Sequence, residues 1–146
     1  GRVLIQTFSP SEPVIQTLTG QMTRKAFLES ERELRQALSY PPFSRLARLR
    51  LEGKEAETAR SRAEAVAKVL TRKIAQLQST SKDALGVEVL GPSEAFISRI
   101  KGSYRYDLLI KSARVQELQS LALEAKHFCA QSGYSVFIDV DPSSIS

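Results

Sequence analysis

Apolar and charged residues alternate about one third of the way along the chain. Ala47, Leu49 and Leu51 are separated by Arg48 and Arg50. Successive side chains of a β-strand point to opposite faces, so this period of two predicts a strand with one buried and one solvated face, beginning near residue 43. A strand of this kind needs a second layer to cover its apolar side.

A long helix is predicted after this strand, over residues 54–78. Its apolar residues recur at steps of three and four, which places them on one face of a helix. The members of this face are Ala63, Val66, Ala67, Leu70, Ile74 and Leu77. We expect the face to pack against a sheet.

A β-hairpin is predicted next. Its first strand comprises Gly86–Leu90 and Ala95–Arg99, with an interruption at Gly91-Pro92 because proline cannot donate a backbone hydrogen bond to a neighbouring strand. Its second strand covers Tyr104–Lys111, beyond a turn near residues 101–103.

A second helix and a last strand complete the pattern. Ser112 is the predicted N-cap of this helix and Gly133 its C′ residue. The last strand is Tyr134–Asp141, with the apolar positions 136, 138 and 140 on one face. The core face of the helix consists of Val115, Leu118, Leu121, Ala122, Ala125 and Phe128.

The order from residue 43 onward is strand, helix, strand, strand, helix, strand. This order (βαββαβ) is the split βαβ pattern of ferredoxin-like α+β sandwiches, in which two helices cover one face of an antiparallel four-stranded sheet. Folds of this kind support many unrelated functions, so the architecture does not by itself indicate an activity.

The first forty residues follow another pattern. Val3–Thr7 is strand-like without a nearby partner, which suggests a missing N-terminal body, and helices are predicted over about residues 13–19 and 21–38. Tyr40–Phe43 ends the second helix, because proline has no amide hydrogen and forces the residue before it out of the α region. We therefore divide the chain into residues 1–39 and 40–146.

Composition narrows the function classes. A formal net charge of +5 and a pI near 9.6 permit an anionic partner without identifying one. His127 and Cys129 are the only histidine and cysteine, so a disulfide within the chain is impossible and a structural zinc site is not expected. The apolar runs are far shorter than the roughly 20 residues of a membrane span, and no signal segment opens the chain, so we expect a cytoplasmic location.

Four short motifs lie in an order and at spacings that resemble a known family. They are GRVLIQT at Gly1–Thr7, YPPF at Tyr40–Phe43, GSYRY at Gly102–Tyr106 and DVDP at Asp139–Pro142. Together they make the whole chain similar to the C-terminal part of the PriA (primosomal protein N′) family of bacterial replication-restart helicases. By this resemblance, residues 1–39 correspond to the end of the second helicase lobe and its linker helix.

The resemblance implies a parent protein that is an ATP-dependent 3′ to 5′ DNA helicase and reloads the replication machinery at stalled forks, in the bacterial cytoplasm with the nucleoid. The parent's ATP, magnesium and zinc sites are not expected here, because the chain lacks a GxxxxGK(S/T) loop and the family's zinc-binding cysteines. We therefore expect no catalytic residue, metal or cofactor. The implied partners are forked or single-stranded DNA, the C-terminal tail of single-stranded DNA-binding protein, other primosome proteins and the remaining helicase domains.

Candidate DNA-binding residues gather around the predicted turn. Arg99, Lys101, Tyr104 and Arg105 combine three cations and an aromatic ring in one short segment. Cations can neutralise phosphates while a tyrosine stacks on an unpaired base. The alternative is a solvated hairpin whose tyrosines pack on the sheet and whose cations keep the edge from aggregating.

Arg48 and Arg50 are further DNA-binding candidates, on the solvated face of the first strand. They extend the basic surface of the hairpin if all these cations lie on one side of the sheet. The alternative is that they pair with Glu52 or with helix carboxylates, as exposed arginines commonly do. The sequence leaves both interpretations open.

The start of the second helix is the candidate site for the protein tail. Arg114, Gln116 and Gln119 occupy the positions at which the resemblance places contacts with the tail of single-stranded DNA-binding protein. A guanidinium matches the two oxygens of a terminal carboxylate and keeps its charge. The alternative is an ordinary exposed arginine in a first helical turn.

Three other residue types in the chain could carry chemistry, namely aspartate, histidine and cysteine. Asp139 and Asp141 face the same side of a strand, as paired catalytic carboxylates or magnesium ligands would, but the sequence places no His, Cys or third acidic residue with them. His127 is predicted to be exposed and Cys129 to be buried in the core. No nucleophile, base and orienting group can be assembled, so the open hypotheses are a DNA- and protein-binding module and a structural domain that braces the helicase lobes.

Overall fold

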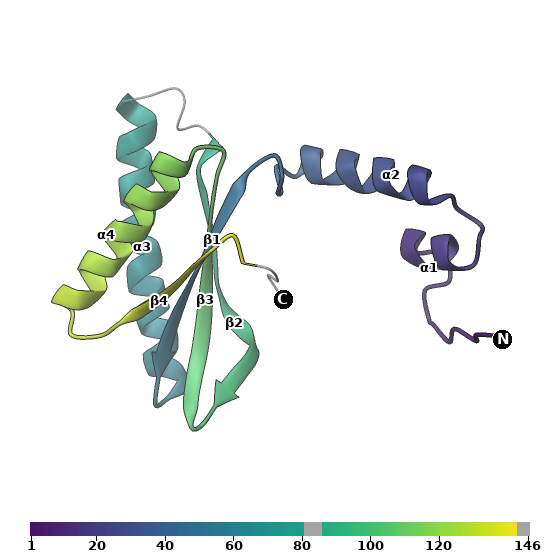
Figure 1. Ribbon diagram of the computed structural model, residues 1–146. Coiled ribbons are helices and arrows are strands. Elements are labelled where there is room, and N and C mark those ends of the chain that lie inside the picture. The colour runs from purple at the N-terminus through teal and green to yellow at the C-terminus, as the bar shows by residue number, and fades with distance from the viewer. Residues whose placement is uncertain (81–85, 143–146) are drawn as a thin grey trace. The chain divides into compact units, whose positions relative to one another are not determined.

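The computed structural model describes residues 1–80 and 86–142 (Figure 1). The chain forms two compact units, residues 1–40 and residues 41–146. The described part of the first unit contains two helices, and that of the second contains a four-stranded sheet and two helices.

The first unit is helical. It contains α1 (Pro13–Leu18) and α2 (Arg24–Ala37). Proline is well suited to the first position of a helix, where its missing amide hydrogen has no partner to lose. Thr23 caps α2, because its Oγ1 accepts a hydrogen bond from the backbone N–H of Ala26 at 3.2 Å. Both predicted helices are confirmed.

The predicted strand at Val3–Thr7 is wrong. Residues 1–7 form neither helix nor strand, and their side chains are exposed. A strand is stabilised by hydrogen bonds to a neighbouring strand, and residues 1–40, all of which are described, contain no other strand. The apolar side chains of this segment therefore lie in solvent.

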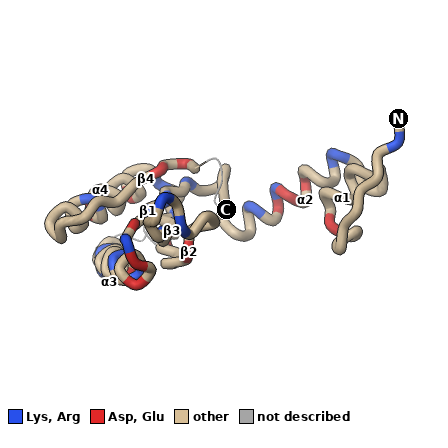
Figure 2. The backbone as a smooth tube through the Cα atoms, turned by 90° about the horizontal axis from the view of Figure 1, so that it is seen from below, with Lys and Arg blue, Asp and Glu red and all other residues tan. Residues whose placement is uncertain are grey.

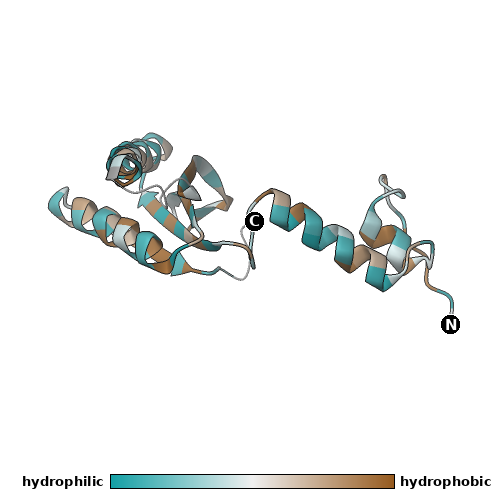
Figure 3. Ribbon diagram, turned by 90° about the horizontal axis from the view of Figure 1, so that it is seen from above, coloured by the Kyte–Doolittle hydropathy of each residue, from teal (hydrophilic) through white to brown (hydrophobic). Residues whose placement is uncertain are grey.

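Helices α1 and α2 bury none of their side chains completely. Apolar residues nevertheless recur along α2, as the brown bands on its ribbon show (Figure 3). Most helical stability in proteins comes from packing of such an apolar face. Residues 1–40 therefore have no buried core of their own.

The second unit is an antiparallel sheet covered on one face. Its strands are β1 (Arg45–Gly53), β2 (Glu88–Ile100), β3 (Ser103–Ser112) and β4 (Val136–Val140), in the order β2-β3-β1-β4 with every neighbouring pair antiparallel. Helices α3 (Ala56–Thr80) and α4 (Val115–Gln131) lie side by side on one face (Figures 1 and 3). The predicted ferredoxin-like α+β arrangement is confirmed.

The hydrophobic core lies between this sheet and the two helices. Leu49 and Leu51 of β1 are fully buried, as are Leu108 and Ile110 of β3. The helices contribute Ala63, Val66, Leu70, Ile74, Leu118, Leu121, Ala125 and Cys129. The apolar residues on one face of the strands and those on one face of α3 and α4 therefore form one core, as predicted.

Strand β1 ends against the beginning of α3 at Gly53. A Cβ atom at this position would lie 2.7 Å from the backbone nitrogen of Ala59. Only glycine permits so close an approach of strand and helix. This contact fixes the place where β1 ends and Lys54 leaves the sheet.

Strand β2 is irregular, as predicted at Gly91-Pro92. Its register against β3 shifts between Leu90 and Ser93. Gly91 has a φ of +98°, and a Cβ atom there would lie 2.9 Å from the carbonyl oxygen of Asp107. A bulge of this kind leaves an extra residue unpaired and bends the strand.

The predicted N-cap of α4 is wrong. The N-cap residue is Arg114, whose side chain makes no capping hydrogen bond, whereas Ser112 is the last residue of β3 because that strand stays paired with β1 up to this point. The Ser112 hydroxyl accepts a hydrogen bond from the backbone N–H of Arg114 at 3.0 Å and donates one to Glu117 at 2.8 Å. Gly133, with a φ of +76°, follows the C-cap residue, so the predicted C′ residue is confirmed.

Replacing Leu49 should test the core. Leu49 is 0% exposed on a strand with partners on both sides, so Leu49→Ala leaves a cavity and should lower the free energy of unfolding by about 3 kcal/mol. Urea denaturation followed by circular dichroism measures this loss. Leu123→Ala is the control, because Leu123 is 65% exposed on α4. Equal losses for the two variants would contradict this core.

Candidate functional site

The sheet face opposite the helices is lined with charge. Ala47, Leu49 and Leu51 point into the core, so alternation turns Arg48 and Arg50 to the opposite face. Lysine and arginine segments are interspersed with aspartate and glutamate segments over the strands and α3 (Figure 2). The attraction of this face for an anion therefore depends on which of its cations already bind carboxylates.

Arg48 and Arg50 each bind an aspartate on a neighbouring strand. The Nε and Nη2 of Arg50 donate to the two carboxylate oxygens of Asp107 on β3, each at 2.8 Å. The Nη2 of Arg48 donates to Asp139 on β4 at 2.8 Å. These partners lie directly across from the arginines in the strand register. The pairing alternative therefore describes both side chains, with strand carboxylates in place of Glu52 or helix carboxylates.

The Arg50–Asp107 pair is partly shielded from water. The side chains are 21% and 14% exposed. Hydrogen bonding to Asp107 raises the pKa of Arg50, while partial burial of the guanidinium opposes that rise. Each of these charged groups is the hydrogen-bonding partner of the other. The side chain of Arg50 is therefore held in place on the sheet.

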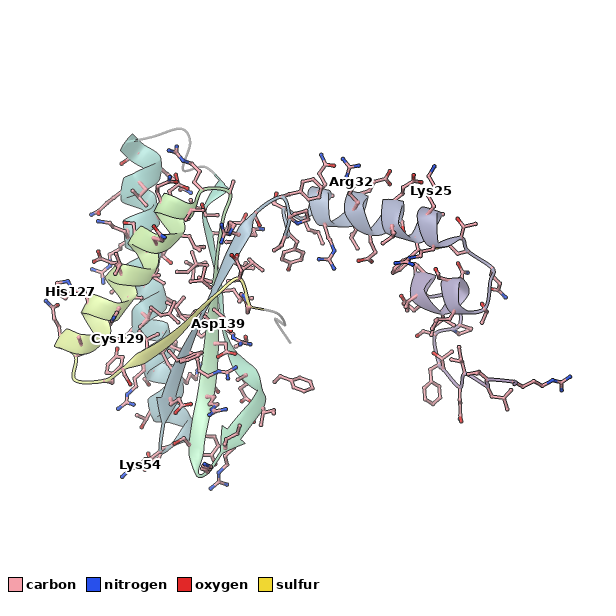
Figure 4. All side chains as sticks on the ribbon, viewed as in Figure 1. Lys25, Arg32, Lys54, His127, Cys129 and Asp139 are labelled. Carbon is pink, nitrogen blue, oxygen red and sulfur yellow. The ribbon has the colours of Figure 1, made fainter. Side chains whose placement is uncertain are left out.

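Asp141 is held by a third arginine. Arg45 donates to both carboxylate oxygens of Asp141, with its Nε 3.1 Å from Oδ1. This hydrogen bonding lowers the pKa of Asp141. Asp139 and Asp141 thus each bind an arginine rather than lying together as a carboxylate pair; Asp139 is labelled on β4 in Figure 4.

Metal ligands are not grouped in the described part of the chain. Within residues 1–80 and 86–142, no three His, Cys, Asp or Glu side chains lie where they could hold one ion. The same residues include no helix that is long and apolar enough to cross a membrane.

Cys129 and His127 lie where the sequence predicted. Cys129 is 1% exposed, and burial raises the pKa of its thiol to about 11. His127 is exposed on α4, and its Nε2 lies 3.1 Å from Nε2 of Gln131. Figure 4 shows His127 pointing away from the sheet. The thiol of Cys129 thus lies in the core, whereas the imidazole of His127 faces solvent.

The β2–β3 hairpin brings the remaining DNA-binding candidates to one end of the sheet. The guanidinium of Arg99 lies over the ring of Tyr104, 5.1 Å from its centroid. Arg105, which neighbours Tyr104 and so points to the opposite face, binds Glu52 at 2.8 Å. Lys101 is exposed in the turn, with a φ of +49°. The candidates therefore lie on two sides of the hairpin and not on one surface.

A hollow of about 510 Å³ lies at the same end of the sheet. It is bounded by residues of β1, β3, β4 and α3 and by the segment that joins β1 to α3. We call it the basic hollow; the residues that characterise it are Arg50, Glu52, Lys54, Arg62, Arg105 and Phe137. Four cations and one carboxylate are thus combined with an aromatic ring.

Lys54, Arg62 and Phe137 were not among the sequence candidates. Lys54 follows the end of β1 directly, and Figure 4 shows it projecting from this end of the sheet. Arg62 donates to the carbonyl oxygen of Glu52, and its guanidinium lies 4.9 Å from the ring centroid of Tyr134. The contacts of Arg62 join α3 to the sheet, and the basic hollow is lined by residues of several elements, so no pattern within a single element could have indicated these three residues.

The start of α4 presents the candidate residues for the protein tail. Gln116 and Gln119 are exposed, and the Arg114 side chain is 49% exposed. The Nε of Arg114 lies 3.9 Å from the carboxylate of Glu117, which is a long and exposed ion pair. The helix start therefore offers a cation and two amides to solvent.

Comparison with known proteins identifies the family. A family model described as "Primosomal protein N C-terminal domain" matches residues 36–143. The chain belongs to this family. The resemblance to the PriA family that the sequence suggested is thereby confirmed. The matched region contains three of the four motifs that suggested it, those at Tyr40–Phe43, Gly102–Tyr106 and Asp139–Pro142.

Similar individual proteins agree with this family assignment. The replication restart protein PriA of Synechocystis sp. is 36% identical over 99% of this chain, and that of Bacillus subtilis is 33% identical over 97%. A probable replication restart protein PriA of Deinococcus radiodurans is 30% identical over 97%. The chain spans only 16%, 17% and 14% of these three proteins, so it matches one region of each.

Among solved structures, the designed protein Foldit4 aligns with 69% of this chain at a TM-score of 0.42 and 13% identity. This likeness is too low to bear on the fold. The assignment to the primosomal protein N C-terminal domain family rests on sequence, and the ferredoxin-like arrangement rests on the strand order and register.

A double-mutant cycle should measure the coupling between Arg50 and Asp107. Each single change, Arg50→Ala or Asp107→Ala, leaves one partly buried charge without its partner, so the free energies of unfolding should be non-additive by about 1 kcal/mol or more. The control cycle uses Arg45 and Asp141, whose side chains are 45% and 41% exposed, and should give a smaller coupling. A larger coupling in the control would contradict the role assigned to Arg50.

Proposed function

We propose that this chain is a non-catalytic DNA-binding domain of replication restart, which contacts forked or single-stranded DNA with the hairpin end of its sheet. The observation that carries the proposal is that several cations lie at this end of the sheet, on both sides of the hairpin rather than on one surface. Arg99, Lys101 and Arg105 belong to the hairpin, and Lys54 follows Gly53, which pairs with the hairpin strand β3. Phosphate neutralisation by such cations supplies most of non-specific DNA affinity.

The family supports this proposal because its members named above are replication restart proteins. In the longer protein, the ATP-dependent helicase would supply the motor and its ATP, magnesium and zinc sites. This chain would add affinity for the DNA fork and contacts with other primosome proteins and the remaining helicase domains. The location that follows is the bacterial cytoplasm, at the nucleoid.

A structural role is the second candidate. Arg48, Arg50 and Arg105 each bind a carboxylate on a neighbouring strand, so these cations already contribute to the sheet itself. In this alternative, the domain braces the helicase lobes and the hairpin cations contact other domains of the longer protein. The isolated chain then has negligible affinity for DNA.

Fluorescence anisotropy with labelled forked and single-stranded DNA separates the two functions. The DNA-binding proposal expects affinity that falls steeply with salt, because binding releases counterions from phosphates. The double change Arg99→Gln and Lys101→Gln should reduce the slope of log affinity against log salt by about 2, one for each lost phosphate contact.

The matched control for this experiment is the double change Lys68→Gln and Arg72→Gln. Both side chains are exposed on α3, at helical positions that point away from the sheet, and the total charge changes equally. If the chain binds no DNA even at low salt, the bracing role replaces the proposal. Equal losses in the two double variants would remove the hairpin from the DNA site.

We also propose that the start of α4 receives the acidic C-terminal tail of single-stranded DNA-binding protein. The support is that the side chains of Arg114, Gln116 and Gln119 are all exposed at the start of one helix, together with the resemblance of these positions to the family's tail contacts. A guanidinium binds a terminal carboxylate by two parallel hydrogen bonds.

Arg114→Ala should weaken binding of a tail peptide about tenfold, the amount expected for one charge-assisted contact. Isothermal titration calorimetry with the peptide measures the loss. Lys126→Ala, which removes an exposed cation near the other end of α4, should leave the affinity unchanged. An unchanged affinity for Arg114→Ala would exclude this residue from the tail site.

A further inference from the structure

Phe137 is an exposed aromatic ring in the basic hollow. It is 61% exposed on β4 and lies directly across from Arg50 in the strand register. An exposed aromatic ring presents a flat apolar face on which the base of a nucleotide could stack. The position beside fixed cations suggests a ligand that has both a flat apolar face and a negative charge.

The guanidinium groups of the basic hollow are held in place before any ligand binds. Asp107 binds Arg50 by two hydrogen bonds of 2.8 Å, and the Glu52 carbonyl and the Tyr134 ring hold Arg62. Preorganised cations lose little conformational freedom when an anion binds. Lys54, which is exposed, can adapt to the position of that anion.

Glu52 opposes an anion in the same hollow. Its carboxylate lies 2.8 Å from Nε of Arg105, and its side chain is 47% exposed. A phosphate that enters the hollow must compete with this carboxylate for Arg105 and is repelled by its charge. Glu52 therefore sets an upper limit on the affinity of the hollow for anions.

We propose that the basic hollow is a subsite for one unpaired nucleotide of a DNA strand, whose base stacks on Phe137 while its phosphate lies among Lys54, Arg62 and Arg105. This assignment rests on the DNA-binding function proposed above and adds the kind of strand that is recognised. A base within a duplex is already stacked on its neighbours and cannot present its face to Phe137. The volume of about 510 Å³ falls within the range of small-ligand sites.

The first experiment titrates the 146-residue chain into a fluorescein-labelled oligothymidine at low salt and reads anisotropy. Phe137→Ala should weaken binding about fivefold or more, the loss expected when one base no longer stacks. Phe96→Ala is the matched control, because Phe96 is 83% exposed on β2 and does not line the basic hollow, and it should leave the affinity unchanged.

Glu52→Gln should act in the opposite direction. It removes the carboxylate that competes for Arg105, so binding should tighten about two- to fivefold, which is the range for one exposed charge pair. Glu64→Gln makes the same change of charge at an equally short pair, that with Arg60, on the flank of α3 opposite Arg62. It should change the affinity less, because it lies outside the hollow.

An abasic oligonucleotide with the same phosphates separates stacking from charge. The effect of Phe137→Ala should disappear with this strand, and the effect of Glu52→Gln should remain. Phe137→Leu keeps an apolar side chain but loses the aromatic face, so it should behave as Phe137→Ala with oligothymidine. Thermal unfolding of every variant confirms that it is folded.

The outcomes distinguish this inference from the proposed function. If the chain binds neither forked nor single-stranded DNA, the proposed function fails, and this inference fails with it. If the chain binds DNA but Phe137→Ala matches Phe96→Ala, or Glu52→Gln matches Glu64→Gln, the nucleotide subsite is wrong while the DNA-binding function stands. Loss of acidic-peptide binding in Phe137→Ala, with DNA binding unchanged, would assign the basic hollow to a protein ligand instead.

Discussion

Strand β1 has a hydrogen-bonded partner on both sides, and this double pairing constrains the rest of the second unit. Its inward side chains must fill the space under α3 and α4, so its outward side chains face those of β3 and β4 at close range. Cations that lie close together on that outer face would repel one another unless carboxylates lay between them. Asp107 and Asp139 meet this requirement by lying across from Arg50 and Arg48.

Periodicity predicted the fold well because each element of the second unit buries one face. Alternation located β1, and helical spacing located α3 and α4 to within a few residues. The strand expected at Val3–Thr7 failed for the opposite reason, since strand-like residues do not make a strand without hydrogen-bonding partners. The misplaced cap at Ser112 shows a related limit, because pairing between strands decided where β3 ends.

The functional residues were harder to predict than the fold. Sequence alone found the cations of the hairpin and of β1, but it could not tell which were paired, because the partners of Arg50 and Arg48 are distant in the chain. Of the residues that characterise the basic hollow, the sequence indicated Arg50 and Arg105 but not Lys54, Arg62 and Phe137. The walls of the hollow come from three strands and a helix, and Phe137 resembles any other strand residue until its exposure is known. Such sites depend on tertiary neighbours, which local patterns do not record.

The ion pairs across β1 and β3 also protect the alignment of these strands against slippage. A slip of one residue would turn the apolar side chains to solvent, but a slip of two would keep every side chain on its own face. Charge opposes that second error. Moving β3 by two residues places Arg50 opposite Arg105 in one direction and Glu52 opposite Asp107 in the other, so like charges meet in both cases. The strand register is thus specified twice, by hydrophobicity and by sign of charge.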